Sequence, residues 1–90
     1  MSNLAVQAAP RRVAGVRFRR VGKKLVLIVG NRVYEMNATA ETVWMRLDGT
    51  TSAQSIAEQI ATEYGQDYQR VEADITELLA TLATLGAVEA

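Results

Sequence analysis

The fold of this chain is decided by the stretch LVLIVGNRVYEMN, residues 25–37. Its first five residues are all apolar and mostly branched, which is typical of a strand that is covered on both faces or lies centrally in a small sheet. Gly30-Asn31 then predicts a two-residue hairpin turn, and a second strand follows over residues 32–36. Asn37 is a typical N-cap, and after it the apolar residues recur at helical spacing. We therefore predict a hairpin that leads directly into a helix.

The two-residue turn fixes the register of this hairpin. Its cross-strand pairs are Val29 with Arg32, Ile28 with Val33, Leu27 with Tyr34, and Leu25 with Met36. Side chains alternate between the two faces of a strand, so one face gathers apolar residues that we expect to pack on the helices. These residues are Leu25, Leu27, Tyr34 and Met36. The other face keeps Val26, Ile28 and Val33 beside Glu35.

A further strand is predicted before the hairpin, because residues 16–19, VRFR, alternate apolar and basic side chains ahead of a turn at residues 22–24. If the three strands form a simple meander, residues 32–36 lie at an edge of the sheet and present unpaired backbone groups. Only Arg32 and Glu35 protect this edge. It can therefore accept an added strand, although short edge strands are often simply tolerated, and both interpretations stay open.

Three helices are predicted after the hairpin, each with a start signal and a stop signal. The N-caps are Asn37, Thr51 and Asp67, and Gln54 completes a capping box with Thr51. The helices end at Asp48-Gly49, Gly65 and Gly86, before a short tail of Ala87-Val88. Their apolar stripes comprise Val43, Trp44 and Leu47, then Ile56, Ala57, Ile60, Ala61 and Tyr64, and finally Val71, Ile75, Leu78, Leu79, Leu82 and Leu85. Helical spacing alone accounts for these residues, so a core role is favoured over a site.

Length and composition predict one small domain without catalytic groups. The chain has 90 residues, 49% of them hydrophobic, which suffices for a single core over residues 13–90. Residues 1–12 sustain no hydrophobic period, so we expect a flexible tail there. The absence of Cys and His removes disulfides, thiolate zinc sites and the commonest general base, so no metal site, cofactor or enzymatic activity is predicted. The chain has no apolar run long enough for a membrane span and no signal peptide pattern, which predicts a cytoplasmic protein without a membrane partner.

The net charge of zero conceals a division of charge along the chain. Eight of the ten basic residues lie within residues 11–32, and all ten acidic residues lie from Glu35 onward. A basic cluster of this kind can attract nucleic acid or an acidic peptide, or it can be balanced within the molecule. Charge alone leaves these alternatives open.

The junction between the sheet and the helices resembles the PqqD family. In that family an apolar residue, Asn, a small or hydroxyl residue and Ala open the first helix, an aliphatic-Trp pair follows, and Leu-Asp-Gly closes it. The matching segments here are Met36-Asn37-Ala38-Thr39-Ala40, Val43-Trp44 and Leu47-Asp48-Gly49. The likeness continues through Ile56-Ala57, Tyr64-Gly65, Val71-x-x-Asp74-Ile75-x-x-Leu78-Leu79-x-x-Leu82 and Leu85-Gly86. It covers roughly residues 13–89 and departs only where the aliphatic after the last glycine is weakened to Ala87-Val88.

The resemblance implies an α+β fold of the winged helix-turn-helix type, with a three-stranded antiparallel sheet followed by three helices. It also implies a non-catalytic protein that binds the leader segment of a ribosomal precursor peptide, while a separate enzyme processes the attached core peptide. The leader then lies along the third strand as an added antiparallel strand, in the groove with the third helix. Carried onto this sequence, the peptide-binding residues are Arg32, Val33, Tyr34, Glu35 and Met36 on the strand and Arg70, Asp74, Glu77, Leu78, Thr81 and Leu82 on the helix.

Some of these helix residues have a second interpretation. Leu78 and Leu82 also fit the core, and Asp74 fits a structural cap or an ion pair as well as a leader contact. The protein itself is expected to be a monomer or a weak homodimer.

The resemblance allows two kinds of partner enzyme. The opening at residues 16–19, Trp44, and Glu35 before Met36-Asn37 resemble the type that serves a leader protease in lasso-peptide biosynthesis. The alternative is the type that assists a radical enzyme using S-adenosylmethionine. A third interpretation, a winged-helix DNA-binding protein, is opposed by charge, because the second and third helices are acidic and duplex affinity comes mainly from Lys and Arg. We therefore predict no nucleic-acid partner.

Overall fold

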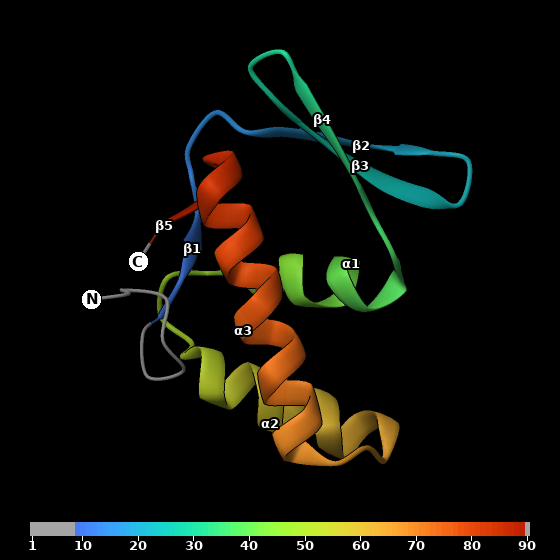
Figure 1. The fold of residues 1–90 in the computed structure, drawn as a ribbon, viewed down its shortest axis with the longest axis vertical. Helices are drawn as coiled ribbons and strands as arrows, with labels where there is room; N and C mark the ends of the chain where they lie inside the picture. The colour runs from blue at the N-terminus through green and yellow to red at the C-terminus, as the bar shows by residue number, and fades with distance from the viewer. Residues whose placement is uncertain (1–8, 90) are drawn as a thin grey trace.

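The computed structural model describes residues 9–89 and confirms the predicted order of three strands followed by three helices, to which it adds two short strands, one near each end of the described part. Its elements are β1 (Arg11–Arg12), β2 (Arg17–Val21), β3 (Lys24–Val29), β4 (Arg32–Met36), α1 (Ala38–Trp44), α2 (Ala53–Tyr64), α3 (Tyr68–Leu85) and β5 (Val88–Glu89). The α+β class, with a three-stranded antiparallel sheet followed by three helices, is therefore confirmed. Figure 1 shows this sheet at one end of the molecule, α2 at the other, and the long α3 running between them. No helix among the described residues is long and apolar enough to cross a bilayer.

The sheet has the strand order β2-β3-β4, and every predicted pair of the β3–β4 register is present. Both hairpins close with two residues, of which the first is a glycine with positive φ, 62° at Gly22 and 62° at Gly30. No other residue type takes a positive φ in the described part of the chain, so Asn31 does not. A glycine in this conformation at the first turn position defines a type II′ turn, whose twist matches that of the flanking strands.

The core lies between one face of the sheet and the three helices. Leu25, Leu27 and Met36 are buried, as their face predicts, and Tyr34 is half-buried at its border. Trp44 is fully buried, and the ring of Phe18 meets it edge-on with centroids 5.8 Å apart. Most of the remaining core comes from the predicted helical stripes, through Val43, Leu47, Ile56, Ala57, Ile60, Ala61, Val71, Ile75, Leu79 and Leu82. Ala40, Ala53, Ala87 and Val88 join it from outside those stripes, whereas Tyr64 of the second stripe is exposed.

The predicted tails are wrong where the structure describes them. Residues 1–8 lie outside the described part, but Arg11 and Arg12 pair with Glu89 and Val88 as the antiparallel strands β1 and β5. An ion pair of 2.9 Å between Arg11 and Glu89 accompanies this pairing. Two strands of two residues carry no hydrophobic period, and these two lie at opposite ends of the described chain. Sequence spacing therefore could not predict them.

The cap of α2 also differs from the prediction. Ser52, and not Thr51, is the N-cap, and its hydroxyl accepts from the backbone N–H of Ser55 at 3.0 Å. Thr51 instead donates its hydroxyl to Asp48 at 2.9 Å. The backbone N–H groups of Thr50 and Thr51 also donate to that carboxylate, and together these bonds hold the pKa of Asp48 well below its ordinary value. Asp48 therefore organises the loop before α2, while α1 already ends at Trp44.

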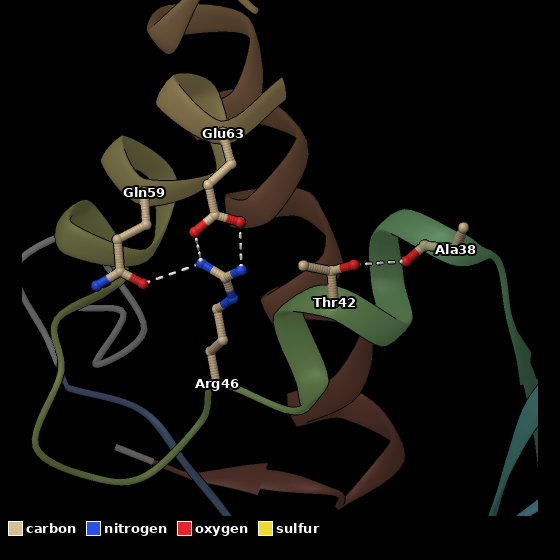
Figure 2. Close-up of polar contacts among 5 residues, drawn as sticks. All are labelled: Ala38, Thr42, Arg46, Gln59 and Glu63. Carbon is tan, nitrogen blue, oxygen red and sulfur yellow. Dashed lines mark hydrogen bonds and ion pairs between the residues drawn. The ribbon is translucent and has the colours of Figure 1, made fainter. Parts of the chain in front are cut away.

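An ion pair fixes the end of α1 against α2, as Figure 2 shows. Arg46, two residues beyond α1, donates to Glu63 through both of its terminal nitrogens, at 2.7 and 3.1 Å. It also donates to the side-chain oxygen of Gln59 at 3.0 Å. The bonds from Arg46 to Glu63 lower the pKa of Glu63 below its ordinary value, because the guanidinium stabilises the charged carboxylate. The ion pair is exposed and adds little stability, but its bidentate geometry orients the last turn of α2.

Gly49 is the glycine at which a side chain is expected to cost most. Its φ is +82°, and a Cβ built there lies 3.2 Å from the Cβ of Arg11 on β1. We expect Gly49→Ala to lower the free energy of unfolding by about 2 kcal/mol, from left-handed backbone strain plus this contact. Gly65→Ala is the matched control, because Gly65 has a φ of +63° but nothing within 4 Å, and it should cost about 1 kcal/mol. Equal losses in urea unfolding would show that β1 does not press on Gly49.

Candidate functional site

The candidate site begins at the free edge of β4. Within the described residues, β4 pairs with β3 alone, so it is an edge strand as predicted. The turn at residues 30–31 makes Val29 and Arg32 a hydrogen-bonded pair, and such pairs alternate along an antiparallel ladder. Arg32, Tyr34 and Met36 therefore bond to β3. The backbone N–H and C=O groups of Val33 and Glu35 point outward from the sheet.

Two adjoining hollows run beside this edge, between β4 and α3. We call them together the β4–α3 groove. The hollow at the Met36 end is about 380 Å³ and is lined by Tyr34, Asn37, Thr39, Ala40, Val43, Asp74, Ile75, Glu77, Leu78 and Thr81. The hollow at the Arg32 end is about 410 Å³ and is lined by Arg32, Tyr34, Ala80, Thr81, Thr84 and Leu85. Tyr34 and Thr81 border both, so the two hollows adjoin along the strand.

The groove brings together six of the eleven residues predicted for the site. They are Arg32, Tyr34, Asp74, Glu77, Leu78 and Thr81. The strand residues reach it because side chains at alternate positions share a face. The helix residues reach it because positions three or four apart lie on one stripe.

The other five predicted residues do not line the groove with their side chains. Val33 and Glu35 project from the opposite face of the sheet, and Val33 is 66% exposed. Met36 and Leu82 are buried in the core, which is the alternative that the sequence left open for Leu82. Arg70 is exposed on the first turns of α3 but borders neither hollow. Val33 and Glu35 therefore contribute to this site only through their backbone, whereas Met36 bonds to β3 and packs in the core.

Sequence reasoning missed several residues of the groove. On α3 these are Ile75, Ala80, Thr84 and Leu85, and helical spacing from Thr81 could have indicated the last two. On α1 and its N-cap they are Asn37, Thr39, Ala40 and Val43. Their part in the site depends on how α1 is placed beside α3, which no local pattern encodes.

The groove is electrically polar along its length. Arg32 lies at one end beside Thr84 and Leu85, while Asp74 and Glu77 lie at the other end beside Asn37. None of these three charged side chains makes an ion pair within residues 9–89, whereas Glu35 on the opposite face lies 3.9 Å from Lys24. The charges of the groove are therefore available to a ligand.

This arrangement suits an extended peptide chain. The outward N–H and C=O groups of two alternate residues form one half of an antiparallel ladder, and strand residues that share a face recur about every 7 Å. A side chain on every second residue of an added strand faces the groove. The backbone edge then provides affinity for any extended segment, and the groove selects among side chains.

Comparison with known proteins gives the family. Residues 23–88 match the family model for Coenzyme PQQ synthesis protein D (PqqD). A protein of Xanthomonas oryzae pv. oryzae described as PqqA binding protein is 39% identical over 84 residues, which are 91% of each chain. A protein of the same description from Xanthomonas campestris pv. campestris (strain B100) is 38% identical over 84 residues, again 91% of each chain.

Two solved structures share the fold. The solution structure of the PqqD truncation of Methylobacterium extorquens PqqCD, a stand-alone recognition element for ribosomally synthesised and modified peptides, superposes with a TM-score of 0.79. It is 29% identical and covers 99% of this chain and 100% of its own. Lasso peptide synthetase B1 in complex with the leader peptide also gives 0.79, but at 24% identity it shows the fold alone, over 92% of this chain and 100% of that one. With a family model that matches residues 23–88, this chain belongs to the PqqD family.

Proposed function

We propose that this protein binds the leader segment of a ribosomal precursor peptide by β-strand addition to β4, and presents it to a separate processing enzyme. The observation that carries the proposal is the outward backbone of Val33 and Glu35 beside the β4–α3 groove. The protein acts by binding and is not itself an enzyme. The leader runs antiparallel to β4, with alternate side chains in the groove.

Two features of relatives support peptide binding. The 39% identical relative is described as binding PqqA, and the Methylobacterium neighbour is described as a recognition element for peptides that are modified after synthesis. Physical reasoning from the edge agrees with this role, because backbone hydrogen bonds recognise an extended chain without requiring a fixed sequence. The hollows then supply selectivity at particular leader positions.

The kind of partner enzyme is the finer part of the proposal. The sequence pattern favours a lasso-peptide leader protease, but the lasso neighbour is only 24% identical and carries the fold alone. The curated relatives near 39% identity are described as PqqA binding proteins, which favours the alternative, a PqqD-type role beside a radical enzyme. We therefore propose the PqqD-type role ahead of the lasso-type role.

A binding titration tests the proposal. Fluorescein-labelled synthetic leaders of the precursor peptides encoded beside this gene are titrated with the protein, and anisotropy is recorded. We expect saturable binding of one leader that survives moderate salt, because backbone hydrogen bonds and side-chain burial depend less on ionic strength than phosphate contacts do. A scrambled leader and a DNA duplex are the controls. Saturable, sequence-selective duplex binding, with flat anisotropy for every leader, would refute the proposal.

A further inference from the structure

A third hollow opens from the end of the β4–α3 groove, between the start of α1, the end of α2 and the first half of α3. It has a volume of about 200 Å³. Thr39, Asp74 and Ile75 line both this hollow and the groove, so the two spaces adjoin. A cavity of about 150 Å³ is enough for a benzene ring, so this side pocket has room for one long side chain.

The walls of this side pocket combine apolar and polar side chains with a single charge. Ile60, Val71 and Ile75 are almost fully buried and supply apolar surface, while Thr39, Thr42 and Gln66 are polar. Asp74 is its only charged residue. Apolar surface beside polar groups and one carboxylate fits the long hydrocarbon stem and charged tip of Lys or Arg, since such side chains bury the stem and keep the tip at a polar group.

The ring of Tyr64 also favours a cation here. Tyr64 lines the side pocket at the last residue of α2 and remains 57% exposed. An aromatic face attracts an ammonium or guanidinium group, and this attraction adds to that of a carboxylate. The ion pair of the preceding residue, Glu63, with Arg46 orients the helical turn that carries Tyr64.

The carboxylate of Asp74 has no partner within the described part of the protein. It makes no hydrogen bond and no ion pair with any of residues 9–89, and it caps no helix, because Asp67 caps α3. The structural roles that the sequence left open for Asp74 are therefore absent there. A ligand that enters the groove meets this charge unneutralised.

We propose that this side pocket is a specificity site for a Lys or Arg side chain of the bound peptide, held by Asp74 and Tyr64. The inference rests on the proposed function, because a side chain can enter the pocket in this way only if the peptide binds in the adjoining groove. An antiparallel strand on β4 places its N-terminal end beside Asn37, and so beside Asp74. The basic residue therefore lies on the N-terminal side of the paired segment.

Selection from a random peptide library tests the inference without knowledge of the leader. A phage library of extended peptides of about 12 residues, longer than the roughly five residues that pair with β4, is selected on the wild-type protein and on Asp74→Asn. The matched control is Glu58→Gln, which removes one negative charge from α2 at an exposed residue that lines none of the three hollows. We expect Lys and Arg to be enriched N-terminal to the apolar positions with wild type and Glu58→Gln, and to be clearly less enriched with Asp74→Asn, where only Tyr64 attracts the cation.

Synthetic versions of a selected peptide then separate charge from stem burial. Replacing its basic residue by norleucine keeps the hydrocarbon stem, and we expect about fivefold weaker binding to wild type, as for one partly exposed ion pair. Asp74→Asn should show a smaller difference between the two peptides, because only the attraction of the Tyr64 ring for the cation remains. A basic preference of undiminished size in Asp74→Asn, or one that lies on the C-terminal side, would overturn the inference while leaving peptide binding intact. Failure to select any peptide, with no leader bound either, would overturn both proposals.

Discussion

Val33→Pro is expected to lower the affinity for the leader peptide by at least about tenfold, while the free energy of unfolding changes by about 1 kcal/mol or less. Proline has no N–H to donate, so an acceptor of the incoming strand would be left without its hydrogen bond. The N–H of Val33 points away from β3, so the internal ladder keeps all its bonds. Anisotropy with the leader and urea unfolding measure the two quantities.

Two variants control this experiment. Val33→Ala removes the exposed side chain but keeps the N–H, so it should bind the leader nearly as wild type does. Tyr34→Pro removes a backbone N–H that points inward and donates to β3. It should therefore destabilise the protein by about 3 kcal/mol. Wild-type affinity in Val33→Pro would exclude the β4 backbone as the acceptor of the peptide.

Amide hydrogen exchange offers a second readout of the same geometry. In the free protein, the amides of Val33 and Glu35 should exchange fast, whereas that of Tyr34 should be protected. Addition of the leader should protect Val33 and Glu35. If the leader binds without this protection, it occupies the groove but does not extend the sheet.

Trp44→Ala is expected to lower the free energy of unfolding by about 3–5 kcal/mol. Trp44 has no exposed surface, meets Phe18 edge-on, and lies 5.6 Å below the guanidinium carbon of Arg12. The side chain of Trp44, on α1, therefore packs against both Arg12 of β1 and Phe18 of β2. Small domains have only about 5–15 kcal/mol of stability, so this loss should lower the urea midpoint steeply.

Two neighbouring substitutions show whether burial causes the effect. Met45→Ala alters the next residue, which is 56% exposed, and should change stability by about 0.5 kcal/mol or less. Trp44→Phe keeps an aromatic ring and should lose less than Trp44→Ala does. A loss of about 1 kcal/mol or less in Trp44→Ala would contradict the packing described for this residue.

The sequence predicted the local parts of this protein well, because their causes lie within a few residues. The hairpin register follows from a two-residue turn, and the cap of α1 follows from Asn37, whose side chain accepts from Ala40 at 2.8 Å. The cap of α2 was misplaced by one residue, since Thr51 and Ser52 are both good caps. Because the hydroxyl of Thr51 donates to Asp48, Ser52 caps the helix instead.

The composition of the groove was only partly predictable. The resemblance and the helical spacing placed Asp74, Glu77, Leu78 and Thr81 at the groove, and the apolar stripe favoured the core for Leu82. They could not show that Arg70 lies outside the hollows. Those outcomes depend on the rotation of α3 against β4, and a stripe of apolar residues is compatible with several rotations.

The sequence by itself determined the order of the three sheet strands and the three helices, the open edge at β4 and most residues of the core, because turns, caps and apolar periodicity act between near neighbours. Only the tertiary structure decided that β1 meets β5 and that Tyr64 of α2 shares a pocket with Asp74 of α3. These contacts join segments distant in the chain, and packing of the whole core, not any local preference, sets how closely they approach.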